Sequence, residues 1–152
     1  MRTPVYRQLD ERECEAVLRR QHIGRLAFVD NNKVDIEPIH YAYRDRWIFG
    51  RTSEGTKVRA LEHRPWVAFE VDEVESPFDW RSVVVHGTIH FLPSDGSPIE
   101  REELARAIEE LRTLAPEILT PSDPAPHRTL VFGLYVDTLT GRAAEHTRTA
   151  RK

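Results

Sequence analysis

The residues best suited to chemistry gather in one short segment in the first half of the chain. Arg51, Thr52 and Ser53 stand where a strand pattern ends, and Gly55 and Lys57 stand where a helix pattern begins. Hydroxyl groups, free first-turn amides and fixed cations hold phosphate groups in proteins, and glycine lets the backbone approach closely. The segment predicts a phosphate site. The alternative is a capped helix in which Arg51 pairs with a surface carboxylate and Lys57 faces water.

Neighbouring motifs exclude several other chemistries. Gly50 and Gly55 are spaced like the glycines of a nucleoside-triphosphate-binding loop, but that loop needs lysine directly after the second glycine, where this chain has Thr56. The Gly-x-Ser-x-Gly segment of serine hydrolases is absent. His86 and His90 share one strand face but would lie roughly 13 Å apart, too far to share a metal ion whose bonds are about 2 Å long. We therefore expect no metal site.

The composition is that of an ordinary globular protein. The chain has 152 residues, of which 39% are hydrophobic and 31% charged, and this length predicts one domain over residues 1–152. A net charge of −3 does not favour nucleic acid, which attracts clustered positive charge. The single cysteine cannot form a disulfide within the chain. Neither a signal-peptide pattern nor an apolar run of membrane-spanning length occurs, so we expect a cytoplasmic protein without membrane contact.

Short strand patterns joined by turns dominate the chain. Asp10 and Glu13 form a capping-box pattern at the start of a first helix, whose apolar face includes Cys14 as a core contact. Tight turns between strands argue against a doubly wound parallel sheet, which needs crossover helices. The pattern predicts a mainly β protein, a small antiparallel barrel with flanking helices, and a polar, frayed tail from about residue 145. The expected strands are 24–29, 34–43, 46–49, 66–71, 82–92 and 129–137, and the later helices are 54–63 and 99–115.

From His22 to Leu92 the chain resembles the flavin-binding split barrels of the pyridoxamine 5'-phosphate oxidase-like superfamily. Residues 139–142 also resemble the family's C-terminal strand ending. The resemblance implies a six-stranded antiparallel split β-barrel and a homodimer whose two flavin sites lie between the subunits. The matching segments, in the family's order, are 23–27, 38–43, 48–57, 67–72 and 80–87.

The resemblance also implies an FMN site made by both subunits. The residues that would hold the phosphate, in agreement with the chemistry of their segment, are Arg51, Thr52, Ser53 and Lys57. Those that would run beside the isoalloxazine ring, largely through backbone groups, are Pro38, Ile39, His40 and Tyr41. Those that would come from the partner chain are Trp80, Ser82 and Val83, with Arg142 as a further contact. The alternative role for Trp80 is ordinary packing in the dimer interface.

The most similar branch is the nitroimidazole-resistance-like group. Its members often have histidine where this chain has Gly50, a departure that argues against nitroimidazole reduction. We expect a flavin-dependent oxidoreductase that acts on a small organic molecule, with His40 or Tyr41 as the candidate proton donors and no assigned catalytic base. The alternatives are a deazaflavin-dependent reductase, a non-catalytic flavin- or haem-binding module, and a cofactor-free dimer.

Overall fold

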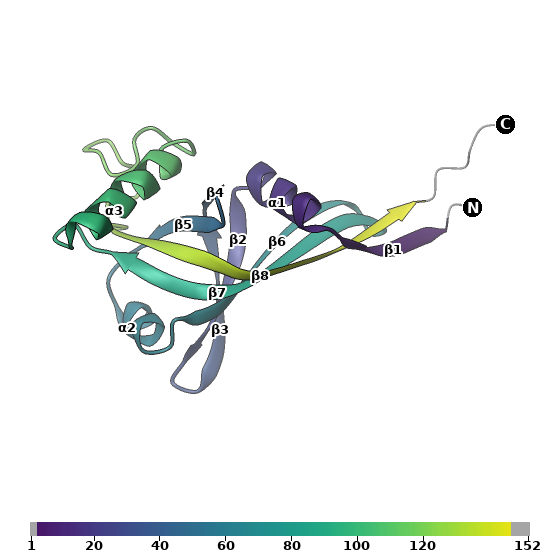
Figure 1. The fold of residues 1–152 in the computed structure, drawn as a ribbon, viewed down its shortest axis with the longest axis horizontal. Helices are drawn as coiled ribbons and strands as arrows, with labels where there is room; N and C mark the ends of the chain where they lie inside the picture. Colours follow the sequence, from purple (N-terminus) through teal and green to yellow (C-terminus); the bar gives the residue numbers. More distant parts are fainter. Residues whose placement is uncertain (1–2, 147–152) are drawn as a thin grey trace.

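One antiparallel sheet organises the part of the chain described by the computed structural model, residues 3–146 (Figure 1). The strand order is β3-β2-β6-β7-β8-β5-β4, and β1 pairs with β8 beside this path. The strands are β1 Pro4–Leu9, β2 Ile23–Asp30, β3 Lys33–His40, β4 Ala42–Arg44, β5 Trp47–Thr52, β6 Trp66–Ser76, β7 Asp79–Leu92 and β8 Leu130–His146. The helices are α1 Glu11–Arg20, α2 Thr56–His63 and α3 Pro98–Leu111. The expected class, mainly β with flanking helices, is confirmed.

The described residues form eight strands where the sequence predicts six, and Tyr41 causes part of the difference. The expected strand over 34–43 is interrupted there, because the Tyr41 amide leaves the ladder and donates to the His22 carbonyl at 2.9 Å. The phenol is fully buried and donates to the Leu18 carbonyl at 2.8 Å. The chain before Tyr41 therefore pairs with β2 as β3, and the chain after it pairs with β5 as β4.

The other additional strand, β1, pairs with an unexpectedly long β8. β8 has 17 residues and pairs with β7 along most of its length, with β5 in its first part and with β1 in its last. Glu145 and His146, expected to be frayed, instead pair with Val5 and Pro4, and the rest of the expected tail lies outside the described residues. β1 and the end of β8 extend to one side, away from α2 and α3 (Figure 1).

The core lies between the sheet and its helices. α1 begins with the expected capping box, in which the Glu13 amide donates to Asp10 Oδ1 at 2.8 Å. Cys14 is 1% exposed and packs toward β8, where a Cβ added at Gly141 would lie 2.6 Å from its sulfur. Gly141 therefore permits the close approach of α1. A second apolar cluster under α3 includes Leu111 and connects this helix to β5, β7 and β8.

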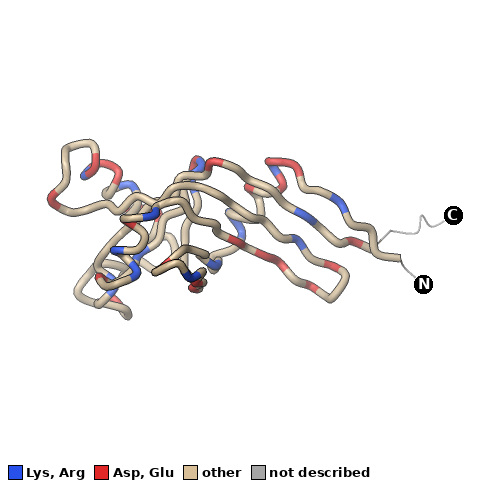
Figure 2. The backbone as a smooth tube through the Cα atoms, turned by 90° about the horizontal axis from the view of Figure 1, so that it is seen from below, with Lys and Arg blue, Asp and Glu red and all other residues tan. Residues whose placement is uncertain are grey.

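Charged residues of both signs are interspersed along the described backbone (Figure 2). This distribution offers no single-sign field of the kind that attracts nucleic acid. Within residues 3–146, no helix has the length and apolar character needed to cross a membrane.

Candidate functional site

A pocket of about 650 Å³ lies where β3, the end of β5 and the start of α2 face the segment that follows α3. It brings together all four predicted phosphate residues and three of the residues predicted beside the ring. The predicted residues that line it are Pro38, Ile39, His40, Arg51, Thr52, Ser53 and Lys57. The pocket is of the size that small-molecule sites have in proteins.

The two sides of this pocket differ in chemistry. Thr52, Ser53 and Lys57 bring hydroxyl and ammonium donors to one side, whereas the segment after α3 brings apolar surface, including Leu111 and Ile118, beside the polar His127 and Arg128. Polar donors suit a phosphate, and an apolar wall suits a flat ring system. The lining therefore fits a ligand that has an aromatic part and a phosphate-bearing part.

Arg51 forms an ion pair with a carboxylate of the same chain. Its guanidinium donates bidentately to Asp123, with Nη2 at 2.9 Å from Oδ1, and the two side chains are only 10% and 2% exposed. Asp123 also accepts from the amides of Leu119 and Ala125 at 2.8 and 2.9 Å. These hydrogen bonds, that from Arg51 first, hold the pKa of the Asp123 carboxyl well below its usual range. The charge of Arg51 is thus compensated by a buried partner rather than by the surface carboxylate considered from the sequence.

Lys57 has a carboxylate partner of a different kind. Its ammonium donates to Glu37 of β3, and both side chains remain partly exposed at the pocket. An ammonium has three hydrogen-bond donors, so the pair with Glu37 leaves Lys57 donors for a ligand. Of the predicted phosphate residues, Thr52, Ser53 and Lys57 have donors that fit a phosphate. Arg51 instead pairs with Asp123 and supports the segment that follows α3.

Two predicted site residues point into the core. Tyr41 and Val83 are fully buried, so either would reach a ligand only through its backbone. Burial also raises the pKa of the Tyr41 phenol, which already donates to Leu18. Of the two candidate proton donors, only His40 lines the pocket.

Three of the four residues expected from the partner chain, all except the buried Val83, lie in a separate pocket of about 540 Å³. Trp80, Ser82 and Arg142 line it together with residues of β1, and none of its lining residues belongs to the first pocket. The Trp80 ring lies beside Tyr6 of β1, with ring centroids 6.4 Å apart. Within one chain, the two groups of predicted residues are thus kept apart.

Sequence reasoning missed the far wall of the first pocket. This wall comes from the end of α3 and the connector of residues 112–129, including Leu114, Pro124, His127 and Arg128. The prolines of the connector signal irregular structure but not what it covers. Asp123 is 72 residues from Arg51 in the chain, so no local pattern reveals their contact.

The family described as pyridoxamine 5'-phosphate oxidase matches residues 10–143 of this chain. An uncharacterised protein of Rhizobium meliloti is 28% identical over 148 residues, which cover 91% of this chain and 95% of that protein. A FAD-binding protein from Mesorhizobium loti is 26% identical, with a TM-score of 0.75 over 93% of this chain and 99% of that one. A candidate 5-nitroimidazole antibiotic resistance protein from Bacteroides thetaiotaomicron shares the fold at 17% identity, with a TM-score of 0.72 over 95% and 90% of the two chains.

The family match includes every predicted site residue, and the solved structures align over almost the whole chain. The arrangement of the sheet is therefore that of a known fold family. This chain belongs to the pyridoxamine 5'-phosphate oxidase family and has its flavin-binding split-barrel fold.

Proposed function

We propose that this chain binds a flavin nucleotide through its FMN moiety and acts as a flavin-dependent oxidoreductase on a small organic molecule. The observation that carries the proposal is the first pocket, where hydroxyl and ammonium donors share one cavity with apolar side chains such as Ile39 and Leu111. The FAD-binding protein from Mesorhizobium loti, which aligns over 93% of this chain, supports a flavin as the ligand.

The pocket chemistry gives the ligand an orientation. The phosphate lies against Thr52, Ser53 and Lys57, and the ring lies between Ile39 of β3 and the apolar wall that includes Leu111. A bound flavin supplies hydride or electron transfer. The residues of the chain bind and orient it, exclude water from one side, and offer His40 as the side chain able to hold a proton at the pocket.

We propose further that the working unit is a homodimer. Tyr6, Val74 and Phe78 lie at the extended end of the sheet near Trp80, and they are 63%, 66% and 49% exposed. Exposed apolar residues in one region mark an association surface. A second copy seated there would bring its Trp80 and Ser82 to the first pocket and complete the ring site.

Nitroimidazole reduction is not part of the proposal. A Cβ added at Gly50 would lie 2.5 Å from Cζ of Phe132 and 3.1 Å from Cγ2 of Ile39. The space for the histidine that nitroimidazole-resistance proteins often have at this position is filled here by two apolar side chains. We therefore do not assign a nitroimidazole as the substrate.

Haem is a second candidate ligand because three histidines, His22, His40 and His127, line the first pocket. Imidazole is a common axial ligand of haem iron. A haem-binding module would need no hydroxyl donors at one end of the pocket, so this candidate leaves Thr52 and Ser53 unexplained. A deazaflavin, by contrast, shares the ring and the phosphate-bearing tail, and would use the same residues as a flavin.

The deciding measurement is an absorbance spectrum of the purified protein before and after incubation with FMN and desalting. We expect flavin bands that persist with about one flavin per chain, because each chain has one complete set of phosphate donors. A strong Soret band in place of flavin bands would support haem instead. A protein that retains no flavin would contradict the cofactor assignment.

A further inference from the structure

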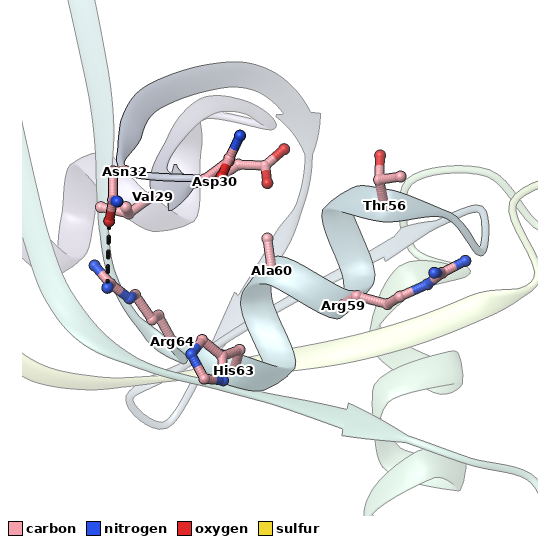
Figure 3. A pocket seen from close by; sticks show the side chains of 9 residues that line it. Val29, Asp30, Asn32, Thr56, Arg59, Ala60, His63 and Arg64 are labelled. Carbon is pink, nitrogen blue, oxygen red and sulfur yellow. Dashed lines mark hydrogen bonds between the residues drawn. The ribbon is translucent and has the colours of Figure 1, made fainter.

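A second cleft, of about 460 Å³, lies between α2 and the turn that joins β2 to β3 (Figure 3). The proposed flavin site uses none of its residues, and the family resemblance assigns none of them a role. They come from the end of β2, the turn, and one face of α2. The lining residues are Val29, Asp30, Asn31, Asn32, Thr56, Arg59, Ala60, His63 and Arg64.

The cleft has unused cationic donors. Arg59 makes no side-chain hydrogen bond or ion pair among residues 3–146, and the bond of Arg64 to Asn32 Oδ1 is long, at 3.5 Å. Figure 3 shows Arg64 directed toward Asn32, whereas Arg59 lies with Thr56 nearer the start of the helix. Asp30 is the only carboxylate in the lining. Because guanidinium groups pair well with phosphate oxygens, the cleft favours an anionic ligand.

The rest of the lining suits a nucleotide base. Val29 and Ala60 form a small apolar surface, and the amides of Asn31 and Asn32 offer both donors and acceptors. Both asparagines have positive φ, 51° and 62°, which asparagine tolerates better than most residues. The tight turn therefore places two asparagines beside the cleft, and the paired donor and acceptor groups of their amides suit an adenine edge.

This cleft adjoins the proposed flavin site at the start of α2. Thr56 lines the cleft, and the next residue, Lys57, lines the first pocket. β3, which follows the turn, carries the Glu37 that pairs with Lys57. A Cβ added at Gly55 would meet no atom within 4 Å, so the space above this helix start is open. A ligand with one phosphate at Lys57 can therefore extend past Gly55 and place a second phosphate near Arg59.

We propose that this cleft holds the AMP half of FAD, so that the chain takes the dinucleotide rather than FMN alone. The inference rests on the proposed function, in which the FMN half occupies the first pocket. The adenylate phosphate lies by Thr56 and Arg59, and the adenine lies against Ala60 within reach of the Asn31 and Asn32 amides. The cleft thereby determines which flavin nucleotide is retained.

The test compares the dissociation constants of FMN and FAD for three proteins by flavin fluorescence. These are the unaltered chain, the double variant Arg59→Ala/Arg64→Ala, and a control, Arg101→Ala/Arg106→Ala, which removes two exposed arginines from α3. We expect the unaltered chain and the control to bind FAD about tenfold or more tighter than FMN. The cleft variant should lose about tenfold in FAD affinity and retain its FMN affinity, which also shows that it is folded.

Equal affinities of the unaltered chain for FAD and FMN would overturn the inference and leave the proposed function intact. Equal weakening of both flavins in the cleft variant would overturn it as well, because the cleft would then not act on the AMP half. Failure of the unaltered chain to bind either flavin would overturn the proposed function and this inference together.

Discussion

Arg51 and Asp123 form a bidentate, almost fully buried ion pair between β5 and the connector that follows α3. Asp123 uses its remaining acceptor capacity on the amides of Leu119 and Ala125. One carboxylate therefore holds an irregular proline-containing segment in place and attaches it to the strand that leads into the phosphate loop. The far wall of the first pocket owes its position to this pair.

Removing the Asp123 charge should loosen the connector. In Asp123→Asn, Arg51 loses its charged partner while it stays buried, and an unpaired buried charge is strongly destabilising. We expect a lower midpoint of thermal unfolding and faster hydrogen exchange at the Leu119 and Ala125 amides. Asp95→Asn is the control, because Asp95 is exposed in a turn. Unchanged exchange at those two amides would contradict the role of Asp123 as an anchor.

Lys57 should distinguish phosphate-bearing from phosphate-free flavins. Lys57→Ala removes a cation and leaves Glu37 unpaired at the pocket, so we expect FMN to bind about tenfold more weakly and riboflavin to be unaffected. Glu37→Gln should do the opposite and strengthen FMN, because Lys57 is then released from its carboxylate partner. Lys33→Ala, at the start of β3 outside the pocket, serves as the control. Equal losses of affinity for FMN and riboflavin would show that Lys57 does not bind the phosphate.

Acid should weaken the junction of β1, α1 and β8. Arg7 donates to Glu13 at 2.7 and 3.0 Å, and these bonds, together with one from the Asp10 amide, lower the pKa of Glu13 from 4.5 to about 2. The unfolded chain therefore takes up this proton first. The stabilisation is complete above pH 4.5 and is lost as the pH falls toward 2.

Urea denaturation across this pH window should show a falling free energy of unfolding. Arg7→Ala should make this part of the pH dependence shallower, because Glu13 and Glu145 both have pKa values lowered by Arg7. Arg12→Ala, at an exposed position of α1, should retain the original slope. An unchanged slope in Arg7→Ala would show that other carboxyls dominate the acid response.

The shared site of the proposed homodimer should show complementation between two defective variants. Lys57→Ala damages the first pocket and Trp80→Ala damages the separate pocket that Trp80 lines, so each homodimer has two incomplete sites. In a mixed dimer one site carries both substitutions and the other carries neither. After subunit exchange at equal concentrations, we expect about a quarter of all sites to bind FMN as in the unaltered protein. If Lys57 and Trp80 act within one chain, mixing restores nothing.

Leu111 tests how strongly the pocket wall depends on core packing. It is 1% exposed at the end of α3, in the cluster with Phe49 and Val131. Leu111→Ala should lower the free energy of unfolding by about 2–5 kcal/mol through lost burial and the cavity left behind. Urea denaturation measures this loss, with Leu114→Ala as the less buried comparison. An equal loss in both variants would show that burial does not set the cost.

Local signals predicted the elements that depend on neighbouring residues. The Asp10–Glu13 capping box, the burial of Cys14 and the gathering of Arg51, Thr52, Ser53 and Lys57 in one pocket all follow from short-range patterns. Family resemblance correctly indicated the fold.

Long-range contacts account for what the sequence did not predict. β1 has exposed Val5 and Tyr6 in place of a buried alternating face, so only its pairing with the end of β8 defines it as a strand. Tyr41 ends β3 by entering the core, and a run of extended residues gives no sign of this. Asp123 looks like any loop aspartate until the fold places it against Arg51.

Cys14 gives the molecule a built-in reporter. Its thiol is shielded between α1 and Gly141, and burial raises its pKa, so a thiol reagent can react only when the helix lifts from the sheet. Because the sequence contains no other cysteine, the labelling rate of the unmodified protein measures this opening alone. Each ligand, partner or substitution that tightens the junction of α1 with β8 would therefore be registered as slower labelling, without any engineered probe.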